Sequence, residues 1–150
     1  MFRGRYEHSI DAKGRTSLPA RFREVLSASG DERLVVTAGL DVCLVAYPMQ
    51  EWLAFEARLA DLPQFDPNVA MLRRIYVSGA VECDLDKLGR LVVPVTLREH
   101  ADLSGKVLWA GMGRHIELWS KSGFESLHAK VISDGEKRAE MLRRLSELGL

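Results

Sequence analysis

The chain has 150 residues, of which 47% are hydrophobic and 28% charged, and its 21 Lys and Arg balance its 21 Asp and Glu. These values are ordinary for a globular protein of one domain or two small ones, and the zero net charge excludes a uniformly basic nucleic-acid binder. Since no apolar run approaches the ~20 residues of a membrane helix and no apolar signal-peptide core begins the chain, a cytoplasmic protein is expected.

The first half predicts a strand, a tight turn, a second strand and a short helix. Side chains alternate over residues 2–10 with the period of two of a strand that has one polar face. A turn follows at residues 11–14, where a glycine can adopt positive φ, and residues 15–18 are extended. Pro19 suits the first turn of a helix over residues 20–26, because its missing N–H would have no partner there.

Two more strands and two helices follow. The strands are expected at residues 34–37 and 42–46, around a glycine turn. Residues 50–62 have apolar side chains at helical spacing, and Asp66 is placed to cap a further helix whose first residue is Pro67. Both helices are expected to pack against the strands.

The second half repeats this order. Its expected elements are a strand at 81–85, a turn at 86–89, a strand at 90–93, a helix from Pro94 and strands at 106–110 and 115–119. Residues 135–148 carry apolar side chains on one face and charges on the other, which predicts an amphipathic helix that packs on its own subunit or on a neighbour.

A nine-residue phrase occurs twice, 75 residues apart. Asp-Ala-Lys-Gly-Arg-Thr-Ser-Leu-Pro at 11–19 returns as Asp-Lys-Leu-Gly-Arg-Leu-Val-Val-Pro at 86–94, with Asp, Gly, Arg and Pro at the same offsets. An arginine follows four residues after each proline, at Arg23 and Arg98. The chain is therefore interpreted as two copies of one small unit. Such a duplication favours a recognition module over an enzyme, because an enzyme needs only one set of reacting groups.

The two copies differ in charge. Residues 1–25 carry six Lys or Arg and three Asp or Glu, a net charge of +3, whereas residues 82–99 carry three and four, a net charge of −1. If one copy binds a polyanion, it is therefore the first.

The first turn carries the candidate DNA contacts. Lys13 and Arg15 flank Gly14 at the tip, where their charged groups can reach phosphates or base edges while the glycine lets the backbone come close. Arg3 and Arg5 lie on the polar face of the preceding strand and are further candidates, with ordinary solvated charges as the alternative.

The acidic residue of each motif has a structural interpretation. Asp11 and Arg15, like Asp86 and Arg90, are four residues apart across a turn and can pair to brace it. Because the acidic second copy has the same pair, bracing is favoured for Asp11, Asp86 and Arg90, and Arg15 is balanced between bracing and contact. Lys13 corresponds to a leucine in the second copy and has no evident structural role in the turn. The arginines after the prolines are expected to be packed or ion-paired.

Nothing in the sequence points to catalysis, a cofactor or a metal. The four histidines are scattered without ligand spacing, and no glycine-rich phosphate loop is present. Cys43 and Cys83 lie in apolar strand-like segments and are expected to be small core residues.

The N-terminal segment through Pro19, together with the second motif, resembles the MraZ family. The resemblance extends from Met1 to about Ser146. The doubled DxxxR motif, in which each copy is followed by a proline, is highly specific for this family. The resemblance implies an α+β fold in which two tandem swapped-hairpin units of the SpoVT–AbrB type form a pseudo-dimeric, barrel-like core with flanking helices. The implied boundaries are a first repeat with its following helix at 1–64, a linker helix at 65–79 and a second repeat with C-terminal helices at 80–150.

The same resemblance implies a sequence-specific DNA-binding transcriptional regulator of the division and cell-wall gene cluster. Its partners would be double-stranded DNA with short direct repeats, and further copies of the chain in a ring. The protein would be cytoplasmic and associated with the nucleoid, and it would bind no membrane. The family's DNA-contacting turn maps onto Lys13, Gly14 and Arg15, with Arg3 and Arg5 as neighbours. The second motif lacks the lysine, so the first turns are expected on DNA and the second half in assembly.

Two other functions are left open. One is an antitoxin-like or scaffold module whose turn binds a protein, which zero net charge would suit; a binding assay with a promoter fragment separates it from a DNA binder. The other is a small hydrolase on a duplicated β unit, which an acidic or histidine pocket would support. Fold alone does not decide among them.

Overall fold

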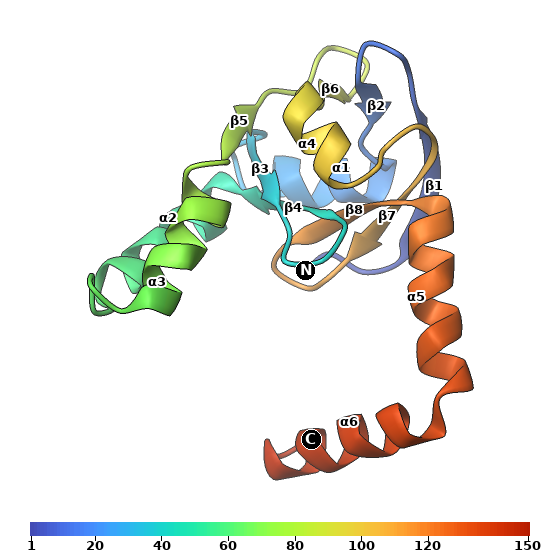
Figure 1. Ribbon diagram of the computed structural model, residues 1–150. Coiled ribbons are helices and arrows are strands. Elements are labelled where there is room, and N and C mark those ends of the chain that lie inside the picture. Colours follow the sequence, from blue (N-terminus) through green and yellow to red (C-terminus); the bar gives the residue numbers. More distant parts are fainter. The chain divides into compact units, whose positions relative to one another are not determined.

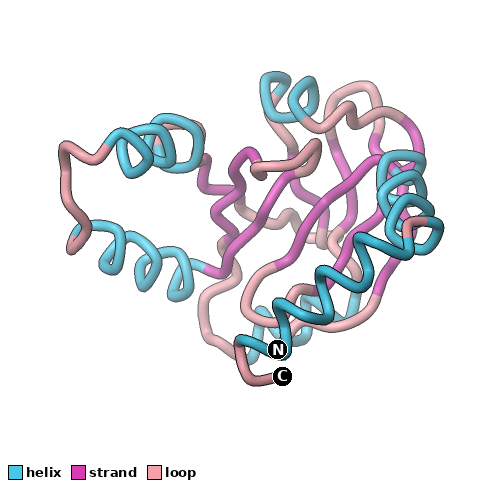
Figure 2. The backbone as a smooth tube through the Cα atoms, turned by 60° about the horizontal axis from the view of Figure 1, so that its bottom comes forward, coloured by secondary structure: helices cyan, strands magenta, loops and turns pink.

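The computed structural model describes residues 1–150, which divide into two units, Met1–Ser120 and Lys121–Leu150. The first unit holds one eight-stranded antiparallel sheet with the order β5-β3-β4-β8-β7-β1-β2-β6 (Figure 1). Its strands are β1 (Arg5–Ile10), β2 (Arg15–Ser17), β3 (Leu34–Ala38), β4 (Leu44–Pro48), β5 (Val81–Cys83), β6 (Arg90–Val92), β7 (Gly105–Gly111) and β8 (Ile116–Ser120). Figure 2 shows these strands, in magenta, wrapped into one curved, nearly closed sheet.

The helices of the first unit are short. They are α1 (Ala20–Ala28), α2 (Met49–Ala60), α3 (Pro67–Leu72), the π-helical turn η1 (Arg73–Val77) and α4 (Val95–His100). The expected α+β fold with a pseudo-dimeric, barrel-like core and flanking helices is confirmed.

The two repeats interlock at a local two-fold axis. Strands β2 and β6 pair antiparallel, and their register joins Thr16 to Leu91, a residue to its own equivalent 75 positions later. Both side chains are buried, with 2% and 1% of their surface exposed. Because the strand after each turn pairs with the corresponding strand of the other repeat, the arrangement is that of swapped hairpins.

The core of the first unit draws on both repeats. One buried cluster contains Phe22 of α1, Leu97 of α4 and Trp109 of β7. The Trp109 indole N–H donates to the backbone oxygen of Ser17 at 3.1 Å, so β7 is tied to β2 as well as packed. Since each repeat contributes side chains to one cluster, neither would keep this core without the other.

Both cysteines belong to the buried part of the first unit. Cys43 and Cys83 are 2% and 7% exposed and are free thiols, which agrees with the expectation of small core residues. Burial raises the pKa of the Cys43 thiol to about 12 and that of Cys83 to about 11, so both are held in the unreactive protonated form.

Helices α2 and α3 form a hairpin beside the sheet, at the left of Figures 1 and 2. Trp52 of α2 packs with Val35 of β3, and the rings of Phe55 and Tyr76 lie 5.7 Å apart. The expected packing against the strands is confirmed for α2 and for η1, which continues α3 and accepts a hydrogen bond from Thr37 of β3 at the Tyr76 oxygen, whereas no residue of α3 itself is buried. Asp66 caps α3 by accepting two backbone N–H groups of its first turn, as its spacing predicts.

Some boundaries differ from those expected. Strand β1 begins at Arg5 rather than at residue 2, because Gly4 has a φ of +95° that interrupts the extended chain. Phe2 still pairs with the sheet, through a single bridge to Gly113. Pro19 stands immediately before the first residue of α1 rather than within its first turn.

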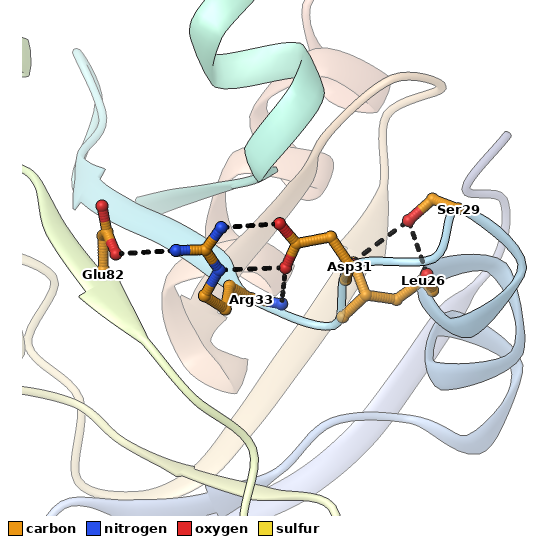
Figure 3. A network of polar contacts seen from close by, with 5 residues as sticks. All are labelled: Leu26, Ser29, Asp31, Arg33 and Glu82. Atoms are coloured by element: carbon orange, nitrogen blue, oxygen red, sulfur yellow. Dashed lines mark hydrogen bonds and ion pairs between the residues drawn. The ribbon is translucent and has the colours of Figure 1, made fainter.

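A polar network links the end of α1 to the other repeat (Figure 3). Arg33 donates from Nη2 and Nε to the two carboxylate oxygens of Asp31, at 2.8 and 3.0 Å, and its Nη1 lies 3.5 Å from Glu82. The Ser29 hydroxyl donates to the backbone oxygen of Leu26 at 2.6 Å, which closes the helix end. Since Glu82 lies on β5, Arg33 bridges the two repeats at the surface.

This network predicts a pH dependence of stability. The Arg33 guanidinium, and then its backbone N–H, lower the pKa of Asp31 to about 2. A lowered folded-state pKa stabilises the fold above the ordinary carboxyl pKa of ~4, and this contribution is lost as pH falls through the folded value. The free energy of unfolding should therefore decline over that interval, and less steeply in Asp31→Asn. Urea unfolding at stepped pH measures both. Asp61→Asn, which changes an exposed carboxylate at the end of α2, is the control. An equal pH dependence of the unfolding free energy in wild type and Asp31→Asn would contradict the prediction.

The second unit consists of α5 (Lys121–Ser133) and α6 (Gly135–Glu147). Asp134 caps α6 by accepting the Lys137 backbone N–H at 3.0 Å. The helix expected over residues 135–148 is therefore present, and its apolar residues Leu142 and Leu148 are 62% and 65% exposed. No helix in the chain combines the length and the apolar character needed to cross a membrane.

Candidate nucleic-acid interface

The first DxxxR motif closes its turn with one carboxylate. Asp11 Oδ1 accepts the backbone N–H groups of Lys13 and Arg15 at 3.0 and 2.9 Å, and Oδ2 accepts Arg15 Nε at 2.7 Å. The Arg15 backbone N–H, followed by its guanidinium, holds the pKa of Asp11 below its usual range. The carboxylate therefore stays charged and fixes both the turn and the base of the arginine side chain.

The second motif repeats this arrangement. Asp86 Oδ1 accepts the backbone N–H groups of Leu88 and Arg90, both at 2.9 Å, and Oδ2 accepts Arg90 Nε at 2.9 Å. The Arg90 backbone N–H is the main cause that lowers the pKa of Asp86. The geometry of the turn is thus independent of the residue before the glycine, which is lysine in one copy and leucine in the other.

Each turn is also bonded to the backbone of the opposite repeat. Leu18 donates its N–H to the Gly89 oxygen at 2.9 Å, and Val93 donates to the Gly14 oxygen at 2.8 Å. Gly14 and Gly89 have φ values of +83° and +75°, in the left-handed region where a side chain is disfavoured. A Cβ on Gly14 would lie 2.6 Å from the oxygen of Val93. Glycine therefore permits the close approach of the two repeats.

The arginines that follow the prolines form hydrogen bonds with the backbone of these turns. Arg98 Nη1 donates to the backbone oxygen of Ala12 at 3.2 Å, and Arg23 Nη1 donates to that of Leu88 at 3.1 Å. Each arginine comes from the helix of one repeat and holds the turn of the other. Their spacing after the prolines was visible in the sequence, but their partners, carbonyl groups of the other copy, were not.

The candidate contact residues fall into two groups. Lys13 is exposed at the tip of the first turn, and its amino group has no partner in the chain. The Arg15 side chain is 40% exposed and bound only through Nε. Arg5 is the first residue of β1, roughly 17 Å of extended strand from the end that leads into the turn, and Arg3 precedes the strand. The structure therefore places Lys13, Gly14 and Arg15 together at the turn, whereas the two N-terminal arginines lie away from it.

Comparison with known proteins agrees with the two repeats. The family model described as "MraZ protein, putative antitoxin-like" matches the chain twice, over residues 1–75 and 76–145. The Transcriptional regulator MraZ of Thermoanaerobacter sp. (strain X514) is 42% identical over 146 residues, which are 97% of this chain and 99% of the relative. That of Pelotomaculum thermopropionicum is 43% identical over 142 residues, 95% of each chain. That of Desulfitobacterium hafniense is 45% identical over 122 residues, 81% of this chain and 82% of the relative. The chain belongs to the MraZ family.

Proposed function

We propose that this chain is a sequence-specific DNA-binding transcriptional regulator. As an oligomer it binds short direct repeats upstream of the division and cell-wall gene cluster, in the cytoplasm at the nucleoid. The observation that carries the proposal is the pair of basic side chains, Lys13 and Arg15, at the tip of a braced turn. The relatives described above are transcriptional regulators by name, which supports it.

The brace gives Arg15 a fixed orientation. Asp11 takes the Nε–H of Arg15 and leaves Nη1 and Nη2 without a partner in the chain. Two parallel donors of this kind match the O6 and N7 atoms of guanine in the major groove, or two oxygens of a phosphate. Because the side chain is ordered before binding, less conformational entropy is lost on complex formation.

Assembly supplies the affinity that one turn lacks. A single turn offers few charge contacts, whereas several turns of an oligomer that meet spaced repeats gain through effective concentration. Lys13, Gly14 and Arg15 are the proposed contacts in each turn. Arg3 and Arg5 are proposed as phosphate contacts outside the turn. No catalytic role is proposed.

Footprinting of the DNA upstream of the chain's own gene tests the proposal. Regularly spaced protection is expected, and the affinity should fall with rising salt by a logarithmic slope of about −0.9 for each phosphate neutralised. A fragment of the same length with shuffled sequence is the control. If neither fragment is bound at low salt while a partner protein is, the antitoxin-like or scaffold module is the better description.

A further inference from the structure

Strands β2 and β6 lie at one end of the eight-stranded sheet, where β6 is the last strand and β2 also pairs with β1. Their paired segment, called the ribbon below, has an outer face that combines both repeats. The central pair of the ribbon is buried, as described above, and the pairs on either side join Arg15 to Val92 and Ser17 to Arg90. Directly paired residues of antiparallel strands point to the same side of the sheet. The side chains of all four residues therefore lie on the outer face.

Val92 is an exposed apolar side chain on this otherwise polar face. It is 57% exposed, and its equivalent in the first repeat is Ser17. Arg15 lies directly across the ribbon from it, and Arg90 precedes it by two residues on the same strand and the same face. Val92 is thus not required to fill the core, and arginines flank it in both directions.

The charge of this face suits a polyanion. Arg90 is held through Nε by Asp86 as Arg15 is held by Asp11, and neither arginine has a partner for its Nη atoms in the chain. The two turns together carry the basic residues Lys13, Arg15, Lys87 and Arg90 and the acidic residues Asp11 and Asp86. In Figure 1 both turns lie side by side at the top of the first unit, above β2 and β6.

We propose that the second repeat completes the DNA-reading surface and that Val92 contacts the methyl group of a thymine. The major groove admits a two-stranded β ribbon, and the thymine methyl is the apolar group displayed there. Because Val92 and Arg15 are opposite each other, this thymine lies beside the base or phosphate that Arg15 contacts. The inference rests on the proposed function and changes the expectation that the second half serves assembly alone.

Replacement of thymine by deoxyuridine removes only the methyl group and tests the contact. The full chain is titrated against the protected upstream fragment, with each thymine of one repeat replaced in turn. The wild type should lose about fourfold in affinity at one thymine, the value of one buried methyl. Val92→Ala should bind the unmodified fragment more weakly and be insensitive to that same replacement.

Val42→Ala is the matched control, because Val42 is 59% exposed in the connection between β3 and β4. It should keep the wild-type sensitivity to deoxyuridine. If Val92→Ala keeps that sensitivity too, or if no thymine replacement weakens the wild type, the assignment of Val92 is overturned while the DNA-binding function stands. If the wild type protects no upstream DNA, both proposals fail.

Discussion

Replacement of Lys13 by alanine should lower the affinity for the upstream DNA by roughly tenfold for each turn that is engaged, without a change in oligomer size. A charge-assisted contact contributes about 1.5 kcal/mol, and the loss is repeated in every turn bound at once. The Lys13 amino group has no partner in the chain, and the turn uses only its backbone N–H. The fold should therefore be unaffected. Gel-shift titration and size-exclusion chromatography measure the two quantities.

The salt dependence separates a direct contact from an indirect effect. With Lys13→Ala, the logarithmic salt slope should become shallower by about 0.9 for each turn on the DNA. Lys106→Ala removes an exposed lysine from β7 and is the control for net charge. Unchanged binding by Lys13→Ala at matched salt, or an equal loss in Lys106→Ala, would refute the assignment of the turn.

Replacement of Gly14 by alanine should lower the free energy of unfolding by about 2–4 kcal/mol. The left-handed conformation of Gly14 costs a side chain ~1–2 kcal/mol. The new Cβ would also lie 2.6 Å from the oxygen of Val93, so the hydrogen bond between the repeats must lengthen. For a chain of this size the melting temperature should fall by roughly 5–15 °C. Calorimetry at a fixed protein concentration measures the change, since assembly also contributes to stability.

Gly30→Ala is the matched control for this variant. Gly30 has the same φ of +83° as Gly14, but a Cβ there would have nothing within 4 Å. It should show the conformational cost alone. The difference between the two variants therefore isolates the contact between the repeats. If both lose equal stability, the close approach at Gly14 does not contribute to the fold.

Much of the fold could be predicted because its signals are local. The period of two, the capping aspartate at Asp66 and the glycine turns each act within a few residues, and the doubled motif disclosed two equivalent units. Strand ends were harder to predict, because they depend on backbone details such as the positive φ of Gly4.

The rest depends on contacts between distant segments. The order of strands, the bonds of Arg23 and Arg98 to the opposite turn, and the position of Val92 beside Arg15 join residues far apart in the chain. No periodicity of a single sequence encodes which copy a side chain touches. The sequence showed the pairing of Asp11 with Arg15 only as a spacing. That Asp11 binds Arg15 through Nε and leaves the Nη atoms without a partner in the chain is seen only in the structure.

The pairing of Thr16 with Leu91 in one polypeptide has a consequence for the orientation of the DNA sites that the proposed function requires. Two identical chains around such an axis would present a symmetric surface and favour inverted half-sites. Here the halves are covalently joined and have diverged, with Lys13 on one side and Leu88 on the other. Such a surface has polarity. Under the proposed function it would distinguish a site from its reverse complement, and successive subunits of an assembly would be expected to engage sites that all run in the same direction.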